Sequence, residues 1–264
     1  MKYLNEVVCK DNLELLKELP SESVDLVYID PPFFTQRNFK NKEGVGFEDK
    51  WDCKYHYIQW MQERVIEIER ILKDTGSIFL HCDWRTSHHM RFMLEEVFGE
   101  KNFVNEVIWH YTGGGRSKKY FSRKHDSLFW YSKIKGNQTF NIDAIRVPYS
   151  KTSSFANSEG VRSKAGKLYR PNPLGTPVDS VWGIPFINNM AKERLGYPTQ
   201  KPEALLERII KACSNEGDII ADFFCGSGTT LAVAKKLGRN YIGCDSNPGA
   251  VRITKERLYG IATG

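Results

Sequence analysis

The chain has 264 residues, of which 41% are hydrophobic and 27% are charged. This is ordinary globular composition, and the length is sufficient to bury a full core in one domain that carries an insertion. No signal-peptide pattern and no apolar run of about 18 residues is present, so we expect a cytoplasmic protein that does not cross a membrane. The six cysteines are scattered without a C-x-x-C pair, which argues against a zinc site, and we expect no bound metal.

The net charge of +6 is concentrated in one stretch of the chain. Residues 116–170 contain 13 Lys and Arg against three acidic residues, a net charge of +10, whereas the other 25 basic and 29 acidic residues leave −4. This asymmetry predicts a polyanionic partner on one face of the molecule. A solvated basic loop is the simpler alternative.

Hydrophobic periodicity, with glycine and proline as boundary signals, predicts alternating strands and helices. The first half of the chain predicts strands at 3–9, 24–29, 77–81, 103–111 and 127–131 and helices at 13–19, 58–72 and 84–98. The polar stretch that ends near residue 49 is long for a plain connection and is typical of a lid or a disordered segment. Periodicity fades over 134–182, which is rich in Ser, Asn, Gly and Pro, and we expect an insertion there.

Regular structure returns in the last third of the chain. This part predicts a helix that opens at Pro202, strands at 219–224 and 240–244, a helix at 229–237 and a final helix that ends at 259. Asn247-Pro248 forms the N-cap and first-turn pair of that final helix. The alternation predicts an α/β fold with a doubly wound, mostly parallel sheet. We expect one domain over 1–264, divided into 1–133, the insertion at 134–182, and 183–264.

The predicted strand at 24–29 is stopped by Asp30-Pro31-Pro32-Phe33. Two successive prolines offer no N–H to a neighbouring strand, and each residue before a proline is held in extended geometry. The result is a stiff strand tip with backbone carbonyls, one carboxylate and an aromatic ring. Such a tip suits an aromatic amine, since it offers acceptors for the N–H groups and a ring to stack on the base. The alternative is an edge-strand stop that only leads into a loop.

A second candidate site lies in the βαβ unit from Ile219 to Asp245. Gly226 and Gly228 allow the backbone to approach a ligand, and Asp245, 19 residues after Gly226, stands where an acid can bind ribose hydroxyls. The third glycine of a dinucleotide fingerprint and the lysine of a P-loop are missing. The pattern therefore favours a nucleoside without pyrophosphate, with S-adenosylmethionine as the obvious candidate. The alternative is a tight βα turn that binds nothing.

Together these stretches resemble the beta class of exocyclic-amino DNA methyltransferases. That class places a D-P-P-Y/F motif first, a target-recognition region in the middle and a D-x-F-x-G-x-G motif last. Asp30 to Phe33 and Asp222 to Gly228 match these motifs in this order, and Tyr197-Pro198-Thr199-Gln200-Lys201-Pro202 is similar to the motif ahead of the cofactor strand. The resemblance covers about residues 1–135 and 180–260. It implies a Rossmann-like, S-adenosylmethionine-dependent methyltransferase fold with the insertion as its target-recognition region.

The resemblance also implies residue roles. Asp30 and the carbonyl of Pro31 would accept hydrogen bonds from the target amine, Pro32 completes the motif, and Phe33 would stack on the extruded base. The implied cofactor site consists of Asp222, Phe224, Cys225, Gly226, Gly228, Thr229, Asp245, Thr199 and Lys201. Within it, Asp245 would bind the ribose, whereas Thr199 and Lys201 would reach the methionine carboxylate. His81 and Asp83 end a strand that should neighbour the cofactor, but they fit ordinary strand-end residues equally well.

The implied activity is transfer of a methyl group to the N6 amino group of adenine in a flipped-out base of double-stranded DNA. Aspartate at the first motif position usually accompanies adenine in this class, so the N4 amino group of cytosine is the alternative. A non-catalytic DNA-binding subunit is another alternative, and the missing glycine disfavours a nicotinamide-dependent oxidoreductase. The start of the basic stretch would supply phosphate contacts through Arg116, Lys118, Lys119, Arg123 and Lys124. A homodimer and a cognate restriction endonuclease are further partners that the class suggests.

Overall fold

Eight strands form the central sheet of the computed structural model, which describes residues 1–113, 115–156 and 159–261. In sheet order the strands are β1 (Glu6–Cys9), β12 (Asn240–Asp245), β11 (Ile219–Asp222), β2 (Val24–Ile29), β5 (Leu72–Cys82), β7 (His125–Ser132), β6 (Phe103–His110) and β10 (Val181–Gly183). Only β7 runs antiparallel to its neighbours in this sheet. The prediction of a mostly parallel sheet is confirmed.

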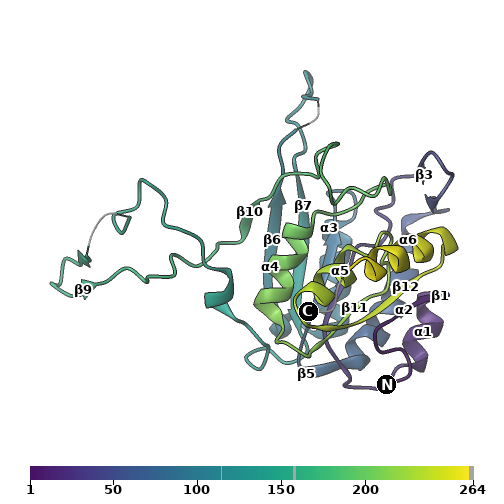
Figure 1. Cartoon of the computed structure of the whole chain (residues 1–264), viewed down its shortest axis with the longest axis horizontal. Coiled ribbons are helices and arrows are strands. Elements are labelled where there is room, and N and C mark those ends of the chain that lie inside the picture. Colours follow the sequence, from purple (N-terminus) through teal and green to yellow (C-terminus); the bar gives the residue numbers. More distant parts are fainter. Residues whose placement is uncertain (114, 157–158, 262–264) are drawn as a thin grey trace.

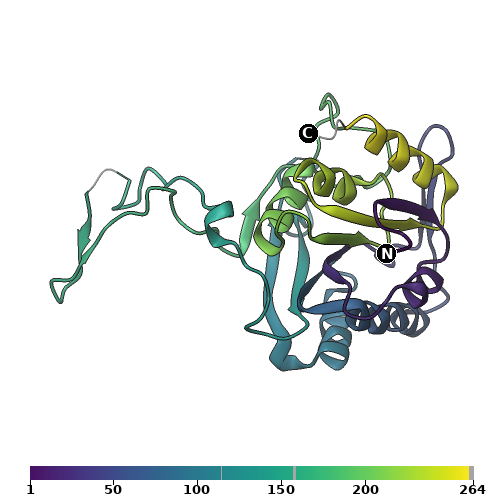
Figure 2. The same cartoon turned by 60° about the horizontal axis from the view of Figure 1, so that its bottom comes forward.

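Helices cover both faces of the sheet (Figures 1 and 2). One face carries α4 (Glu203–Cys213), α5 (Thr229–Lys236) and α6 (Pro248–Tyr259), and the other carries α1 (Asn12–Glu18), α2 (Lys54–Ile71) and α3 (Ser87–Phe98). Strand β2 contributes to both buried clusters, with Leu26 on the side of α4 and Ile29 on the side of α2. All six of its residues are buried, and all but Asp25 are apolar or aromatic, as expected for a strand covered on both faces. None of the described helices is long and apolar enough to cross a membrane.

Local sequence signals predicted the ends of several elements correctly. β2 ends at Ile29, immediately before the two prolines, and the Asn247 side chain accepts hydrogen bonds from the backbone N–H groups of Gly249 (2.8 Å) and Ala250 (3.2 Å) at the start of α6. β11 ends two residues earlier than predicted. The Asp222 carboxylate accepts a hydrogen bond from the Phe224 N–H at 3.0 Å, and this bond turns the chain out of the strand.

The polar stretch after Phe33 is an ordered hairpin and not a disordered segment. Strands β3 (Arg37–Lys40) and β4 (Gly46–Asp49) pair antiparallel, and the Phe39 and Phe47 rings stack with their centroids 5.1 Å apart. The Asn41 side chain accepts from the backbone N–H of Val45 at 2.9 Å and closes the turn. Short polar strands of this kind carry little hydrophobic periodicity, so the sequence pattern did not reveal them.

The insertion is narrower than predicted. The 3₁₀ turn η2 (Ile142–Ile145) packs against α4, where the Asn141 N–H donates to the Ala212 carbonyl at 2.7 Å, and β10 extends the main sheet beside β6. Between η2 and β10 the chain leaves the body as an extended arm that carries the short pair β8 (Val161–Arg162) and β9 (Leu168–Tyr169) (Figures 1 and 2). An isolated bridge between Val147 and Thr176 closes the arm at its base.

Candidate active site

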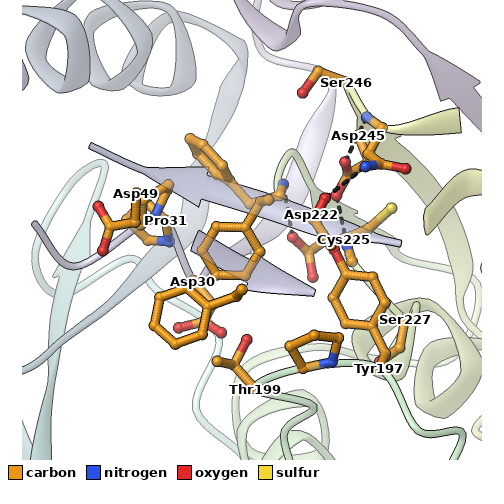
Figure 3. Close-up of a pocket in the computed structure, with 18 of the residues that line it drawn as sticks. Asp30, Pro31, Asp49, Tyr197, Thr199, Asp222, Cys225, Ser227, Asp245 and Ser246 are labelled. Atoms are coloured by element: carbon orange, nitrogen blue, oxygen red, sulfur yellow. Dashed lines mark hydrogen bonds between the residues drawn. The ribbon is translucent and has the colours of Figure 1, made fainter. Parts of the chain in front are cut away.

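The two motifs meet at one edge of the sheet. β11 pairs with β2 in parallel, with Ile220 opposite Leu26 and Ala221 opposite Val27, so both strands end on the same side. The Asp30–Phe33 tip and the glycine turn that follows Asp222 therefore line a single cavity of about 630 Å³ (Figure 3). Ligands of open α/β sheets bind at such carboxyl edges, and the volume is that of a small-molecule site.

The strand tip brings the Asp30 carboxylate and two proline carbonyls to this cavity. The Pro32 carbonyl is occupied, since it accepts a hydrogen bond from the Tyr57 hydroxyl at 2.7 Å. The Pro31 carbonyl receives no hydrogen bond from residues 1–113, 115–156 or 159–261. Asp30 Oδ2 forms an ion pair with the ammonium of Lys201, whereas the buried Oδ1 has no hydrogen-bond donor among the described residues. The Pro31 carbonyl and the Asp30 carboxylate are therefore the two acceptors at this tip that an amine requires.

Asp49 organises the backbone that follows the two prolines. Its fully buried carboxylate accepts hydrogen bonds from the N–H groups of Phe33 (3.2 Å), Phe34 (3.0 Å) and Thr35 (2.7 Å), and also from the indole of Trp51 (3.1 Å). Phe34 is held at a φ of 59°, which is uncommon for a residue other than glycine. This carboxylate thus fixes the backbone at Phe33, whose ring faces the cavity. No local pattern around Asp49 predicts this role.

Asp222 and Asp245 end neighbouring strands on the cofactor side of the cavity. Asp222 accepts from the Phe224 N–H at 3.0 Å and from the Thr230 hydroxyl, and its complete burial raises its pKa to about 7. Asp245 accepts from the N–H groups of Gly226 and Asn247, both at 2.9 Å, and burial raises its pKa as well. Asp245 therefore anchors the glycine turn, and its remaining lone pairs can still accept hydroxyl donors.

The two glycines of the turn serve different purposes. Gly226 (φ 50°) lines the cavity, and a Cβ atom there would lie 3.0 Å from the Tyr197 ring. Gly228 (φ 71°) does not line it. A Cβ atom at Gly228 would come within 2.4 Å of the Thr254 side chain on α6. The second glycine of the motif thus permits close helix packing and not contact with the ligand.

The cavity gathers the other residues of the predicted cofactor site. Those that line it are Asp222, Phe224, Cys225, Gly226, Thr229, Asp245, Thr199 and Lys201, so only Gly228 of the predicted set lies outside. Thr199 has a φ of 60°, a strained conformation for a β-branched residue, and such strain is found at functional sites. Asn12 also lines the cavity although its position gave no signal. Its amide donates to the Phe223 carbonyl at 2.9 Å and supports the turn from α1.

The candidate phosphate-contacting residues lie in the connection between β6 and β7, at the same edge of the sheet. Arg116, Lys118 and Lys119 are exposed. Arg123 stacks on the Trp84 ring at 3.8 Å, and the Lys124 ammonium bonds the Gly113 carbonyl. Two of the five basic side chains therefore also hold the connection together.

His81 lies beside Asp30, because β5 pairs with β2 and not with the cofactor strand β11. β2 therefore separates the end of this strand from the glycine turn that follows β11. The His81 Nδ1 atom is 3.6 Å from Asp30 Oδ1, and the His81 and Phe33 rings are 5.5 Å apart. Within the described part of the chain, no group of three or more His, Cys, Asp or Glu residues could hold a metal ion.

This fold, with its cavity at the carboxyl edge and its paired acceptors, defines a methyltransferase of the α/β class. A family model described as DNA methylase, covering the N6 and N4 methyltransferases, matches residues 24–256, and the chain belongs to this family.

Individual relatives agree with this assignment. The chain is 33% identical to the Type II methyltransferase M.HpaI of Haemophilus parainfluenzae over 96% of its own length and 73% of the relative. It is 34% identical to the DNA adenine methyltransferase YhdJ of Escherichia coli over 96% of its length and 82% of the relative. Among solved structures, the cytosine-N4-specific PvuII DNA methyltransferase matches with a TM-score of 0.68 at 18% identity, covering 98% of this chain and 88% of that one. The complex of M1.HpyAVI with SAM matches with a TM-score of 0.60 at 23% identity, covering 96% and 98%. At these identities the structural matches support the fold alone.

Proposed function

We propose that this DNA methyltransferase transfers the methyl group of S-adenosylmethionine to the N6 amino group of adenine. The observation that carries the proposal is the single cavity that joins the acceptors of Asp30 and Pro31 to the glycine turn and Asp245. An amine held at one end of this cavity lies within reach of a nucleoside cofactor held at the other.

The residues on the cofactor side fit S-adenosylmethionine. The backbone at Gly226 borders the cavity without a side chain, and Asp245 offers carboxylate lone pairs for ribose hydroxyls. The Phe224 ring lines the same cavity and gives an apolar surface for the adenine. Lys201 supplies a positive charge for the methionine carboxylate. When bound, the cofactor supplies a methyl group on a positively charged sulfur atom.

The strand tip activates the amine. The lone pair of an exocyclic nitrogen is delocalised into the base, so this nitrogen is a poor nucleophile. Hydrogen bonds from its two N–H groups to the Asp30 carboxylate and the Pro31 carbonyl draw it toward tetrahedral geometry and free the lone pair. As the nitrogen gains positive charge, the Asp30 carboxylate stabilises it, and the rigid prolines hold the acceptors in place. No covalent intermediate with the protein is required.

The base must leave the duplex to reach the cavity, and Phe33 offers the ring on which it stacks. The exposed basic residues between β6 and β7 stand at the same edge and would hold the DNA backbone. The arm carries further positive charge, including Arg162, Lys164 and Lys167, and we assign target recognition to it.

Adenine is favoured over cytosine by two observations. The first motif residue is Asp30, and aspartate at this position usually accompanies adenine in the class. In addition, YhdJ, which is 34% identical to this chain, is named a DNA adenine methyltransferase. We further propose a cytoplasmic homodimer that acts beside a cognate restriction endonuclease, since several relatives are Type II methyltransferases. Sedimentation analysis would test the dimer.

Identification of the modified nucleoside tests the proposal. DNA without prior methylation is incubated with the protein and S-adenosylmethionine carrying a labelled methyl group, and is then digested to nucleosides for mass spectrometry. We expect labelled N6-methyldeoxyadenosine. Labelled N4-methyldeoxycytidine would assign the enzyme to cytosine, and the absence of both would support a non-catalytic subunit. The variant Asp30→Ala should bind cofactor normally in calorimetry but lose methyl transfer by about 10²-fold or more.

A further inference from the structure

A buried histidine links the catalytic strand tip to a second carboxylate. His81 is fully buried, and its Nε2 atom lies 3.2 Å from Asp126 Oδ2 on β7. On the opposite side of the ring, Nδ1 lies 2.8 Å from the Tyr28 hydroxyl and 3.6 Å from Asp30 Oδ1. The three residues Asp30, His81 and Asp126 thus form a continuous row that leads from the cavity into the sheet.

The hydrogen-bond pattern fixes the state of the histidine ring. Burial alone would raise the pKa of Asp126, but the hydrogen bond and charge of His81, the charge of Lys201 and the Tyr111 hydroxyl together lower it. Asp126 is therefore an ionised acceptor, and His81 must donate to it from Nε2. In the neutral ring Nδ1 then carries no proton and accepts from the Tyr28 hydroxyl. This leaves Asp30 Oδ1 without a donor in the described structure.

Protonation of His81 would supply the hydrogen-bond donor that Asp30 Oδ1 lacks. An Nδ1–H group could donate to Asp30 Oδ1 after a small side-chain rotation, and the Tyr28 oxygen could accept instead of donating. The imidazolium would then stand between two carboxylates in a site from which solvent is excluded, where opposite charges interact strongly. The groups that face the ring from the elements around it are Tyr28 and Asp30 of β2, Asp126 of β7 and the uncharged ring of Trp109 on β6, with Lys201 reaching it only through Asp30.

The proposed reaction creates a proton that must leave the amine. When the nitrogen lone pair forms its bond to the methyl carbon, the carbon–sulfur bond breaks and its electron pair stays on sulfur, which becomes a neutral thioether. The nitrogen then carries a positive charge and one proton too many. That proton can pass to the Asp30 carboxylate, which already accepts one of the N–H groups.

We propose that His81 receives this proton from Asp30 and that Asp126 holds the ring in the orientation that makes the transfer possible. His81 is thus a positioning residue that acts through Asp30, and it holds the proton while the base occupies the cavity. Once the methylated base has left, the proton returns through Asp30 to solvent, and both groups regain their starting protonation states before the next turnover. This inference rests on the proposed function. It adds a buried route for the proton where the cavity side of Asp30 is occupied by Lys201 and the base.

The first test measures protonation of the ring without any reaction. The His81 imidazole is followed by NMR as the pH is changed, and its signals are assigned by their loss in His81→Gln. In Asp126→Asn the imidazolium loses its counter-charge, so the ring should become protonated only at lower pH than in the wild type. A ring that titrates at the same pH in both proteins, or that never becomes protonated while the protein is folded, would overturn the proposal.

The second test measures single-turnover methyl transfer against pH. The wild-type rate should fall on the acid side at the pH at which NMR shows His81 to be protonated, because a protonated ring cannot take the proton. The acid limb should move to lower pH in Asp126→Asn. His81→Gln should lose this limb and react about 10²-fold more slowly, with cofactor affinity unchanged in calorimetry. Equal rates and equal pH profiles in His81→Gln and wild type would contradict the assigned role.

A matched control separates this role from a general loss of stability. Ser77 is buried on the same strand, and its hydroxyl accepts from the Trp130 indole at 3.0 Å, far from the cavity. Ser77→Ala removes a buried hydrogen bond of β5 and should keep the wild-type rate and pH profile. If the wild-type protein methylates no base, the proposed function fails. If it methylates DNA and His81→Gln behaves like Ser77→Ala, only the proton route fails.

Discussion

The ammonium of Lys201 forms an ion pair with the carboxylate of Asp30, which is 171 residues away in the chain. Lys201 also stands at the cavity edge where the methionine carboxylate is proposed to bind, 5.4 Å from the centre of the Phe33 ring. Under the proposed function this one cation would serve two carboxylates, that of Asp30 and that of the cofactor. Attraction to the cofactor carboxylate would draw Lys201 away from Asp30 Oδ2 and free that oxygen for the amine.

This relationship predicts how Lys201→Met affects binding. S-adenosylhomocysteine, which retains the carboxylate, should bind about 10- to 100-fold more weakly, because a charge-assisted hydrogen bond is lost. Methylthioadenosine, which lacks the carboxylate, should bind with unchanged affinity. Calorimetry with both ligands checks the prediction, and Lys211→Met, at an exposed i,i+4 pair with Glu207, is the control. Equal weakening for the two ligands would show that Lys201 acts only through Asp30.

The strand tip and the glycine turn could be predicted because local chemistry dictates them. Two successive prolines end a strand because they offer no N–H to a neighbouring strand. Glycine is favoured at position 226 because the backbone there, just after β11, adopts a left-handed conformation. Parallel strands in a doubly wound sheet end at the same edge, so the proximity of Asp30 and Asp222 follows from the alternation of elements. Local sequence signals and the alternation of elements were therefore enough to predict the α/β class and the two motifs that line the cavity.

The remaining parts of the site depend on register and on packing across the chain. His81 and Asp126 meet because β5 and β7 pair with His81 opposite Leu128, a register that no local pattern specifies. Gly228 follows the spacing of a ligand-binding glycine but is required by Thr254 on α6. Asp49 meets the Phe33 backbone only after the β3–β4 hairpin has formed. A polar residue in a weakly patterned stretch gives no signal of such a role.

Asp49 should be important for both stability and activity. In Asp49→Ala the N–H groups of Phe33, Phe34 and Thr35 lose their buried acceptor, and we expect the free energy of unfolding to fall by about 3 kcal/mol. Methyl transfer should fall further than cofactor binding, because the backbone at Phe33 is no longer fixed. Urea denaturation measures the first effect. Asp52→Asn, whose side chain is 95% exposed, should change stability by less than about 0.5 kcal/mol.

The arm should be separable from the catalytic body. Val147 and Thr176 pair at its base, so residues 148–175 can be replaced by a short Gly-Ser turn without changing the path of the sheet. We expect the shortened protein to fold and to bind cofactor with unchanged affinity but to lose preference for any DNA sequence. Sequencing of methylated positions before and after replacement measures this preference. An unchanged set of methylated sites would place target recognition elsewhere.

The exposed lysines between β6 and β7 should set the salt dependence of DNA binding. Each phosphate contact that is lost should reduce the slope of log affinity against log salt by about 0.9. The double variant Lys118→Gln, Lys119→Gln should therefore bind more weakly at low salt and show a slope shallower by up to about 2. Fluorescence anisotropy at several salt concentrations checks this. Lys17→Gln, exposed in the last turn of α1, is the control and should leave the slope unchanged.

Asp222 should make the protein less stable as the pH rises. Burial raises its pKa to about 7 in the folded protein, from an ordinary value of 3.8. Below pH 3.8 the group is protonated in both the folded and the unfolded chain, whereas between pH 3.8 and about 7 the unfolded chain releases the proton first. The contribution of Asp222 to stability is thus fully present in acid and is lost as the pH rises through this window.

Asp222→Asn removes the charge while its amide can still bond the Phe224 N–H and the Thr230 hydroxyl. The variant should therefore gain stability relative to the wild type from pH 4 to pH 7, on the order of a few kcal/mol, as measured by urea denaturation. A difference that stays constant across this range would show that Asp222 is ionised throughout.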